Sequence, residues 1–92
     1  MIKLTAKTPG ELGLIIANNV RARRKGRSLS MERLAEISGV SYGSIRRFEE
    51  TGEISLKSLL KIAIVLDCTE EFEQLFERSR PQSIQEIING KL

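Results

Sequence analysis

Residues 29–52 carry the side chains in this chain that are best suited to recognising another molecule. The second half of this stretch predicts a short helix whose outer face is polar, basic and small. Arginine can donate two parallel hydrogen bonds to O6 and N7 of guanine, so Arg46 and Arg47 suit insertion into the major groove of DNA. The same arginines can instead form a solvated helix face or pair with Glu49 and Glu50. The residues alone leave both interpretations open.

The charges of the chain are distributed unevenly, although the net charge is only +3. Residues 21–47 contain eight basic residues against two acidic ones, Glu32 and Glu36. Residues 67–77 contain five acidic residues and no compensating lysine or arginine. A basic half that faces a polyanion and an acidic half that faces away are typical of nucleic-acid binding. Chance clustering on a solvated surface is the alternative.

The chain offers little equipment for catalysis or for binding a metal ion. It has no histidine and one cysteine, Cys68, which is most simply a small packing residue. Glu70, Glu71 and Glu73 lie on successive helix faces and suit a solvated surface better than a paired-carboxylate site. We therefore expect no enzyme activity, metal or cofactor. Apolar runs are too short to span a membrane, and we expect a cytoplasmic, nucleoid-associated protein.

Capping residues and apolar spacing predict an all-α fold. Thr8, Pro9 and Glu11 form a capping box that begins a helix over about residues 9–25. Serine caps and glycine stops then bound helices over about residues 31–38, 42–50 and 56–66, and Thr69 is expected to cap a fifth, acidic helix. Spacings of three and four residues predict the inward-facing side chains. These are Leu12, Ile16 and Val20; Leu34 and Ile37; Ile45 and Phe48; Leu56, Leu59, Leu60, Ala63 and Leu66; and Phe72, Leu75 and Phe76.

The two ends of the chain give weaker signals. Residues 2–5 alternate apolar and polar side chains, which hints at a short strand or an arm. After Pro81, a Ser83/Glu86 capping box predicts a last short helix that must dock on this domain or on another chain. We expect one domain over residues 1–92, with a core at about 9–78 and an extension at 79–92.

The spacing of small, glycine and apolar residues in residues 29–52 indicates two helices that cross closely and are joined by a turn. Two helices that cross closely need a small residue at the crossing, which is Ala35, a turn at Gly39, and apolar side chains between them, which are Val40 and Ile45. With these residues in place, the chain resembles the Cro/CI-type (Xre-family) helix-turn-helix proteins, which have the lambda-repressor-like fold. The resemblance covers roughly residues 12–66 and extends to the expected fifth helix. The matching residues are Val20, Arg21, Arg24, Leu29, Ser30, Leu34, Ala35, Gly39, Val40, Ser41, Ser44, Ile45, Phe48, Glu49, Gly52, Ser55, Leu56, Leu59, Leu60, Ala63 and Leu66.

This resemblance implies a five-helix domain that binds double-stranded DNA as a dimer and commonly represses transcription. The third helix would be the recognition helix, and Arg47 would be its main base reader. The implied base-reading face comprises Tyr42, Gly43, Ser44, Arg46 and Arg47. The implied phosphate contacts are Arg21, Arg24, Arg27, Ser30, Met31, Ser41, Thr51, Ser55 and Lys57. Glu49 is expected to be structural, either pairing with Arg24 or accepting backbone hydrogen bonds.

Two positions depart from the family pattern. Met31 stands where the family often has a glutamine that touches phosphate, and Tyr42-Gly43 stands where longer polar readers are common. The apolar fourth and fifth helices and the C-terminal extension also suit a second function. The protein could be a homodimeric regulator, or an antitoxin similar to HipB-like proteins that binds operator DNA and a toxin partner.

Overall fold

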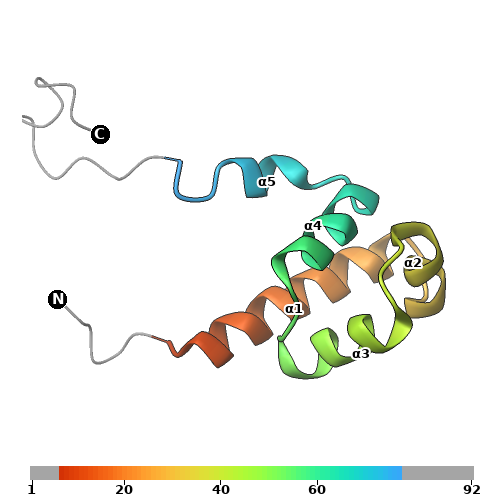
Figure 1. Ribbon diagram of the computed structural model, residues 1–92, viewed down its shortest axis with the longest axis horizontal. Coiled ribbons are helices and arrows are strands. Elements are labelled where there is room, and N and C mark those ends of the chain that lie inside the picture. The colour runs from red at the N-terminus through yellow and green to blue at the C-terminus, as the bar shows by residue number, and fades with distance from the viewer. Residues whose placement is uncertain (1–6, 78–92) are drawn as a thin grey trace, which may run out of the picture.

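Five α-helices make up the part of the chain that the structure, a computed structural model, describes, which is residues 7–77 (Figure 1). They are α1 (Pro9–Gly26), α2 (Met31–Ser38), α3 (Tyr42–Thr51), α4 (Leu56–Val65) and α5 (Thr69–Glu73). The predicted all-α, five-helix fold is confirmed, and within residues 7–77 there is no strand. The hinted strand at residues 2–5, the last short helix and the extension at 79–92 lie outside the described residues.

Local capping determines where most of the helices begin. Thr8 forms the predicted capping box with Glu11: the Glu11 amide donates to Thr8 Oγ1 (3.1 Å), and the Thr8 amide donates to Glu11 Oε1 (2.8 Å). The helices α2, α3 and α4 each begin after a serine whose side chain accepts an amide hydrogen bond from the first turn, at Ser30, Ser41 and Ser55. The predicted cap at Thr69 is wrong. Cys68 occupies the N-cap position of α5 and makes no side-chain capping bond.

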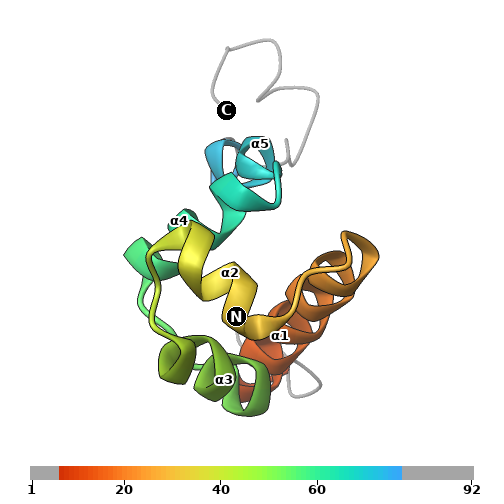
Figure 2. The ribbon, with the colours of Figure 1, turned by 90° about the vertical axis from the view of Figure 1, so that its right-hand side faces the viewer.

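The core lies between the helices in two adjoining clusters of buried side chains. The first joins α2, α3 and α4 through Leu34, Val40, Ile45, Ile62 and Leu66, and the second joins α1, α3 and α4 through Ala17, Phe48 and Leu59. Figures 1 and 2 show α3 and α5 at opposite sides of the molecule. The recognition helix predicted from the sequence is therefore held against α1, α2 and α4 and leaves one face to solvent.

The inward face of α1 differs from the prediction. Leu12 and Ile16 are 49% and 44% exposed, whereas Ala17 and Arg24 are buried. The reason is a close backbone approach between α1 and the loop after α3. A Cβ atom built on Gly13 would lie 2.8 Å from the carbonyl oxygen of Gly52. The closest face of α1 must therefore carry small residues, and the large aliphatic residues turn outward.

Other inward-facing predictions also need correction. Ile37 and Leu56 are exposed, while Ile62, which lies outside the predicted stripe of α4, is almost fully buried. The helix α4 carries apolar residues on more than one side, so two apolar stripes with helical spacing exist. Packing against the other helices buries the stripe that contains Ile62. At the end of the described residues, α5 ends at Glu73, before Leu75 and Phe76, so helical spacing does not place them beside Phe72. Both are exposed.

Candidate nucleic-acid interface

The predicted turn between α2 and α3 is present and explains how α3 is positioned. Gly39 closes α2 in the left-handed conformation, with φ at 78°. Val40 and Ile45 are buried against Leu34, and the half-buried Ala35 packs against the same cluster. A short turn of this kind fixes the angle between two helices because each buried side chain contacts both of them.

The face of α3 opposite Ile45 and Phe48 is open to solvent. All the predicted base readers lie on it or at its borders and are exposed: Tyr42, Gly43, Ser44, Arg46 and Arg47. Gly43 has no atom of the protein within 4 Å of the place where a Cβ would stand. The protein itself therefore does not require a glycine there, although glycine destabilises a helix relative to alanine.

A buried ion pair joins α1 to α3. Arg24 Nε donates to Glu49 Oε2 (2.8 Å), and Arg24 Nη2 donates to Glu49 Oε1 (2.9 Å). The third donor group, Nη1, reaches the carbonyl oxygen of Leu29 just before α2 (2.6 Å). Both side chains are almost fully buried, at 8% and 6% exposed. The hydrogen bonds from Glu49 raise the pKa of the Arg24 guanidinium, which stays charged.

This geometry gives Arg24 a structural role, and its predicted phosphate contact stays a prediction. Each of the three guanidinium nitrogens donates one hydrogen bond inside the protein, and the side chain is only 8% exposed, so little of it is presented to a ligand. The pairing with Glu49 was the other expectation for these residues, and it is present. Arg24 is thus a positioning residue that ties the recognition helix to α1. Arg21, whose Nε lies 3.8 Å from Glu49 Oε1, stays half exposed and free to turn outward.

The two arginines on the exposed face of α3 each have a carboxylate partner. Arg46 Nε donates to Glu50 Oε1 (3.1 Å), and this bond raises the pKa of Arg46. Arg47 Nη2 donates to Glu53 Oε1 (2.6 Å), in the loop after α3. The alternative interpretation of the sequence, pairing with Glu49 and Glu50, is thus correct for Arg46. Arg47 pairs with Glu53, which the sequence analysis did not consider.

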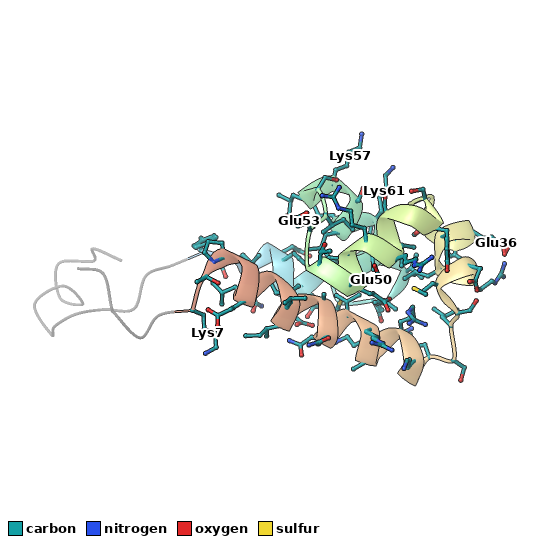
Figure 3. All side chains as sticks on the ribbon, turned by 90° about the horizontal axis from the view of Figure 1, so that it is seen from below. Lys7, Glu36, Glu50, Glu53, Lys57 and Lys61 are labelled. Atoms are coloured by element: carbon teal, nitrogen blue, oxygen red, sulfur yellow. The ribbon has the colours of Figure 1, made fainter. Side chains whose placement is uncertain are left out.

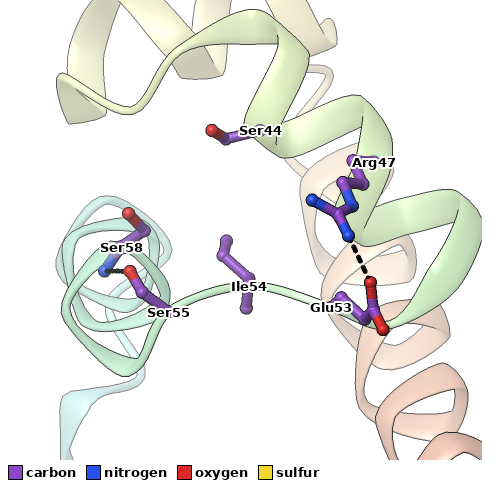
Figure 4. Close-up of a pocket in the computed structure, with 6 residues that line it drawn as sticks. All are labelled: Ser44, Arg47, Glu53, Ile54, Ser55 and Ser58. Carbon is purple, nitrogen blue, oxygen red and sulfur yellow. Dashed lines mark hydrogen bonds and ion pairs between the residues drawn. The ribbon is translucent and has the colours of Figure 1, made fainter.

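A hollow of about 290 Å³ lies beside Arg47, between α3 and the beginning of α4 (Figure 4). Ser44 and Arg47 line it from α3, Glu53 and Ile54 from the loop after α3, and the N-cap Ser55 and Ser58 from the start of α4. The first amides of α4 have no partner within the helix, so this border suits an anion. Lys57 is exposed on the first turn of α4, and Figure 3 shows it on the same side as Glu53.

The hydroxyl groups among the predicted phosphate contacts fall into two kinds. Ser30 and Ser55 accept an amide hydrogen bond as helix caps and keep a hydroxyl hydrogen for another acceptor. Ser41 and Thr51 use theirs inside the protein. Ser41 Oγ donates to Ser44 Oγ (2.8 Å), and Thr51 Oγ1 donates to the carbonyl oxygen of Arg47 (2.7 Å).

The remaining predicted phosphate contacts differ in exposure. Arg27 is exposed in the loop after α1. Met31 packs against the first core cluster, so only its backbone amide at the start of α2 remains for a phosphate. Within residues 7–77 there is no group of three or more potential metal ligands, and none of the helices is long and apolar enough to cross a membrane.

Two residues that shape this face were not predicted from the sequence. Glu53 holds Arg47, and Gly13 allows α1 to approach the loop that carries Glu53. A signal for Gly13 exists in hindsight, because a glycine within a helix that carries large aliphatic residues on either side often marks a close contact. No short-range spacing rule identifies Glu53, which is six residues from Arg47 and outside the helix.

Comparison with known protein families gives one match. A family model described as helix-turn-helix matches residues 20–72, which is more than half of the chain. The matched range begins within α1 and ends within α5, so it contains both helices of the central unit and the residues that hold them. No curated protein matches the chain.

Proposed function

Because this chain belongs to the Cro/CI/Xre-type helix-turn-helix family of DNA-binding regulators, we propose that it is a sequence-specific transcriptional regulator that reads double-stranded DNA with α3. One observation carries the proposal: α3 is fixed from behind by the buried Arg24–Glu49 pair and presents Tyr42, Gly43 and Arg47 to solvent. A rigid helix with an exposed donor-rich face is what base readout in the major groove requires.

Arg47 is the base reader in this proposal, through two hydrogen bonds to one guanine. Ser44 and Tyr42 border it along α3, Arg46 contacts DNA at the edge of the groove, and Gly43 lets the helix backbone approach the bases. These groups supply the sequence-dependent part of binding.

Phosphate contacts flank α3 on both sides and fix the register of the protein on DNA. The basic contacts are Arg21, Arg27 and Lys57, and the hydroxyl and amide contacts come from Ser30 at the start of α2 and Ser55 at the start of α4. We leave Arg24 out of this set because its side chain is buried and each of its three nitrogens already donates to Glu49 or Leu29.

We further propose that the protein binds as a homodimer, with two copies of α3 in successive major grooves about 34 Å apart, and that it represses transcription by excluding polymerase. The exposed aliphatic side chains Leu12 and Ile16 support the existence of a protein–protein contact. Because its target is genomic DNA, the proposal implies a cytoplasmic, nucleoid-associated protein.

An antitoxin role is the second candidate. Ile64 on α4 and Phe76 just after α5 are 68% and 99% exposed, and these apolar side chains support a protein partner. Because α5 lies on the opposite side of the molecule from α3 (Figure 1), a partner bound there would leave α3 open to DNA. Size-exclusion chromatography with light scattering, run on the purified protein and on material captured from native extract, separates the two roles. A stoichiometric second protein in the captured complex favours the antitoxin, and a homodimer alone favours the regulator.

Selection of bound duplexes from a random pool, followed by titration of the selected site, tests the proposed function. Arg47→Ala should weaken binding to the selected site by about 1–3 kcal/mol and relax discrimination at one base pair. Lys7→Ala is the matched control, since it removes one exposed positive charge just before α1, outside α3 and outside the proposed DNA contacts (Figure 3). Equal losses for the two variants, or wild-type affinity that does not fall with salt, would refute the proposal.

A further inference from the structure

The ion pair between Arg47 and Glu53 is held in place by the backbone around it. Thr51 Oγ1 donates to the carbonyl oxygen of Arg47 (2.7 Å) and accepts from the amide of Glu53 (3.2 Å), so one hydroxyl connects the two residues. Between them, Gly52 takes the left-handed conformation, with φ at 81°, and turns the chain back toward α3. Glu53 therefore lies beside Arg47 because of the loop geometry, and its carboxylate meets the guanidinium at 2.6 Å (Figure 4).

This carboxylate also changes the charge of the surface that would face DNA. From Met31 to Glu53 the chain has three arginines and five glutamates, a net charge of −2. Arg33, Arg46 and Arg47 each have a glutamate partner, and Glu49 is buried with Arg24. The reading helix and its neighbours thus lack the excess positive charge that attracts DNA of any sequence. Within residues 7–77, the basic side chains without an ion-pair partner include Lys25 and Arg27 at the end of α1 and Lys57 and Lys61 on α4, and these supply that attraction.

The geometry points to Glu53 as a specificity-determining residue: it holds Arg47 in an ion pair that a guanine at the correct position breaks and that the DNA backbone alone does not. This inference rests on the proposed function and adds a residue that does not itself contact a base. Specificity is a difference between two affinities, and weakening the binding of wrong sites increases it as effectively as improving the contacts of the right one.

The competition follows from the geometry of the guanidinium. A single phosphate offers Arg47 an exposed ion pair similar to the one that it already makes with Glu53, so little free energy is gained by exchanging one for the other. A guanine offers two hydrogen bonds in a fixed planar arrangement, which is stronger. On unmatched DNA, Arg47 therefore stays with Glu53 and does not contribute to binding.

Glu53→Gln removes the carboxylate and keeps the size of the side chain. It should raise affinity for duplexes of random sequence by about two- to five-fold, the factor expected for releasing one exposed ion pair. It should also steepen the salt dependence of that binding by about 0.9 in log–log slope, because the freed Arg47 neutralises one more phosphate. Affinity for the selected site should change less, so the specificity ratio falls.

Two matched variants isolate the cause. Glu73→Gln makes the same change in net charge on α5, on the opposite side of the molecule from α3, and should leave the random-sequence affinity and the salt slope near the wild-type values. In an Arg47→Gln background, Glu53→Gln should lose its effect on the slope, because no guanidinium remains to be released. Far-UV circular dichroism of each variant checks that the fold is kept, which is expected since both Arg47 and Glu53 are exposed.

The results of these variants either support or overturn the role of Glu53 in specificity. A larger effect of Glu53→Gln than of Glu73→Gln on random-sequence DNA, lost without Arg47, supports the inference. Equal effects of the two variants overturn it and leave an ordinary solvated ion pair. An effect that persists in the Arg47→Gln background also overturns it, because Glu53 then acts only as a repelling charge. Wild-type protein that binds no DNA defeats the proposed function itself, and the inference with it.

Discussion

The Arg24–Glu49 pair leads to a prediction about folding that requires no knowledge of the DNA site. We consider three variants: Arg24→Met, which keeps most of the apolar stem; Glu49→Leu; and the two together. Arg24 makes three hydrogen bonds, two to Glu49 and one to the carbonyl oxygen of Leu29, at 2.6–2.9 Å. Because both side chains are at most 8% exposed, solvent cannot replace the missing partner. Each single variant leaves a buried charge uncompensated.

The expected magnitudes differ between the two single variants. Removal of one partner of a buried ion pair costs about 3–5 kcal/mol. Glu49→Leu should lie near about 4 kcal/mol, because the buried guanidinium of Arg24 keeps only the Leu29 carbonyl. Arg24→Met should lie nearer about 3 kcal/mol, since Arg21, 3.8 Å from Glu49, can move toward the carboxylate. The double variant should return to within about 2 kcal/mol of wild type, because apolar pairs often replace buried ion pairs at little cost and only the Leu29 carbonyl stays unpaired.

Urea unfolding followed by circular dichroism measures these free energies, and thermal unfolding provides a second readout. A loss of about 3 kcal/mol should lower the Tm of a domain of this size by roughly 12–24 °C. Arg21→Met is the control, since it removes the same charge near the same carboxylate from an exposed position and should cost less than about 1 kcal/mol. If Arg24→Met cost no more than Arg21→Met, or if the losses of the two single variants simply added in the double variant, the buried pair would not be what holds α3 to α1.

Two further predictions concern α1. Gly13→Ala should lower the free energy of unfolding in urea by about 1–3 kcal/mol, because its Cβ would meet the Gly52 carbonyl oxygen at 2.8 Å. Gly10→Ala is the control and should be neutral or slightly stabilising, since its Cβ would meet only Thr8 Oγ1, at 3.9 Å. Equal effects of the two variants would contradict the close approach. The hydrogen bonds from Thr8, the backbone amide foremost, lower the pKa of Glu11 in the folded protein. The contribution of Glu11 to the free energy of unfolding is therefore present above the ordinary carboxyl pKa of about 4.3 and is lost as the pH falls through the lower pKa of the folded state. Wild type should therefore lose more unfolding free energy between neutral and acidic pH than Glu11→Gln does, and identical pH profiles would rule out this contribution.

Local signals predicted much of the fold, because they depend on a few adjacent residues. The serine caps of α2, α3 and α4, the capping box of α1 and the left-handed glycine after α2 each satisfy the backbone within one turn, and the sequence shows them directly. The helix-turn-helix register added the relative placement of α2 and α3. The wrong prediction of Thr69 as the N-cap of α5 also concerns a local signal, because a threonine at this position can be either the N-cap or the first residue of the helix.

The faces of α1 and α4 could not be predicted in the same way. Both helices carry aliphatic residues on more than one face, so spacing alone allows several inward faces, and the choice depends on the helix opposite. In α1 the choice is made by Gly13, whose missing side chain lets the backbone of Gly52 approach. In α4 it is made by the space that Ile62 fills between Leu34 and Ile45. Contacts between residues distant in sequence set both.

The exposed face of the candidate interface was predicted from the sequence, but not all of the ion-pair partners of its arginines were. Residue types identified the exposed face of α3, and Tyr42, Ser44, Arg46 and Arg47 do lie on it or at its borders. A count of charges along the chain could not show which arginines are already engaged. The cluster at the end of α1 includes one buried guanidinium, and the arginines of α3 have glutamate partners. The base and phosphate contacts themselves stay predictions.

The two contacts between α1 and the region of α3 have a common consequence for DNA binding. Arg24 holds Glu49, and Gly13 meets Gly52, so α1 fixes the C-terminal half of the recognition helix, while Val40 and Ile45 fix its N-terminal half through α2. The same loop places Glu53 against Arg47. A change at Gly13 would therefore displace both the reading helix and the carboxylate that holds its arginine. If α3 reads DNA as proposed, Arg24 and Gly13 therefore affect affinity and specificity by positioning it.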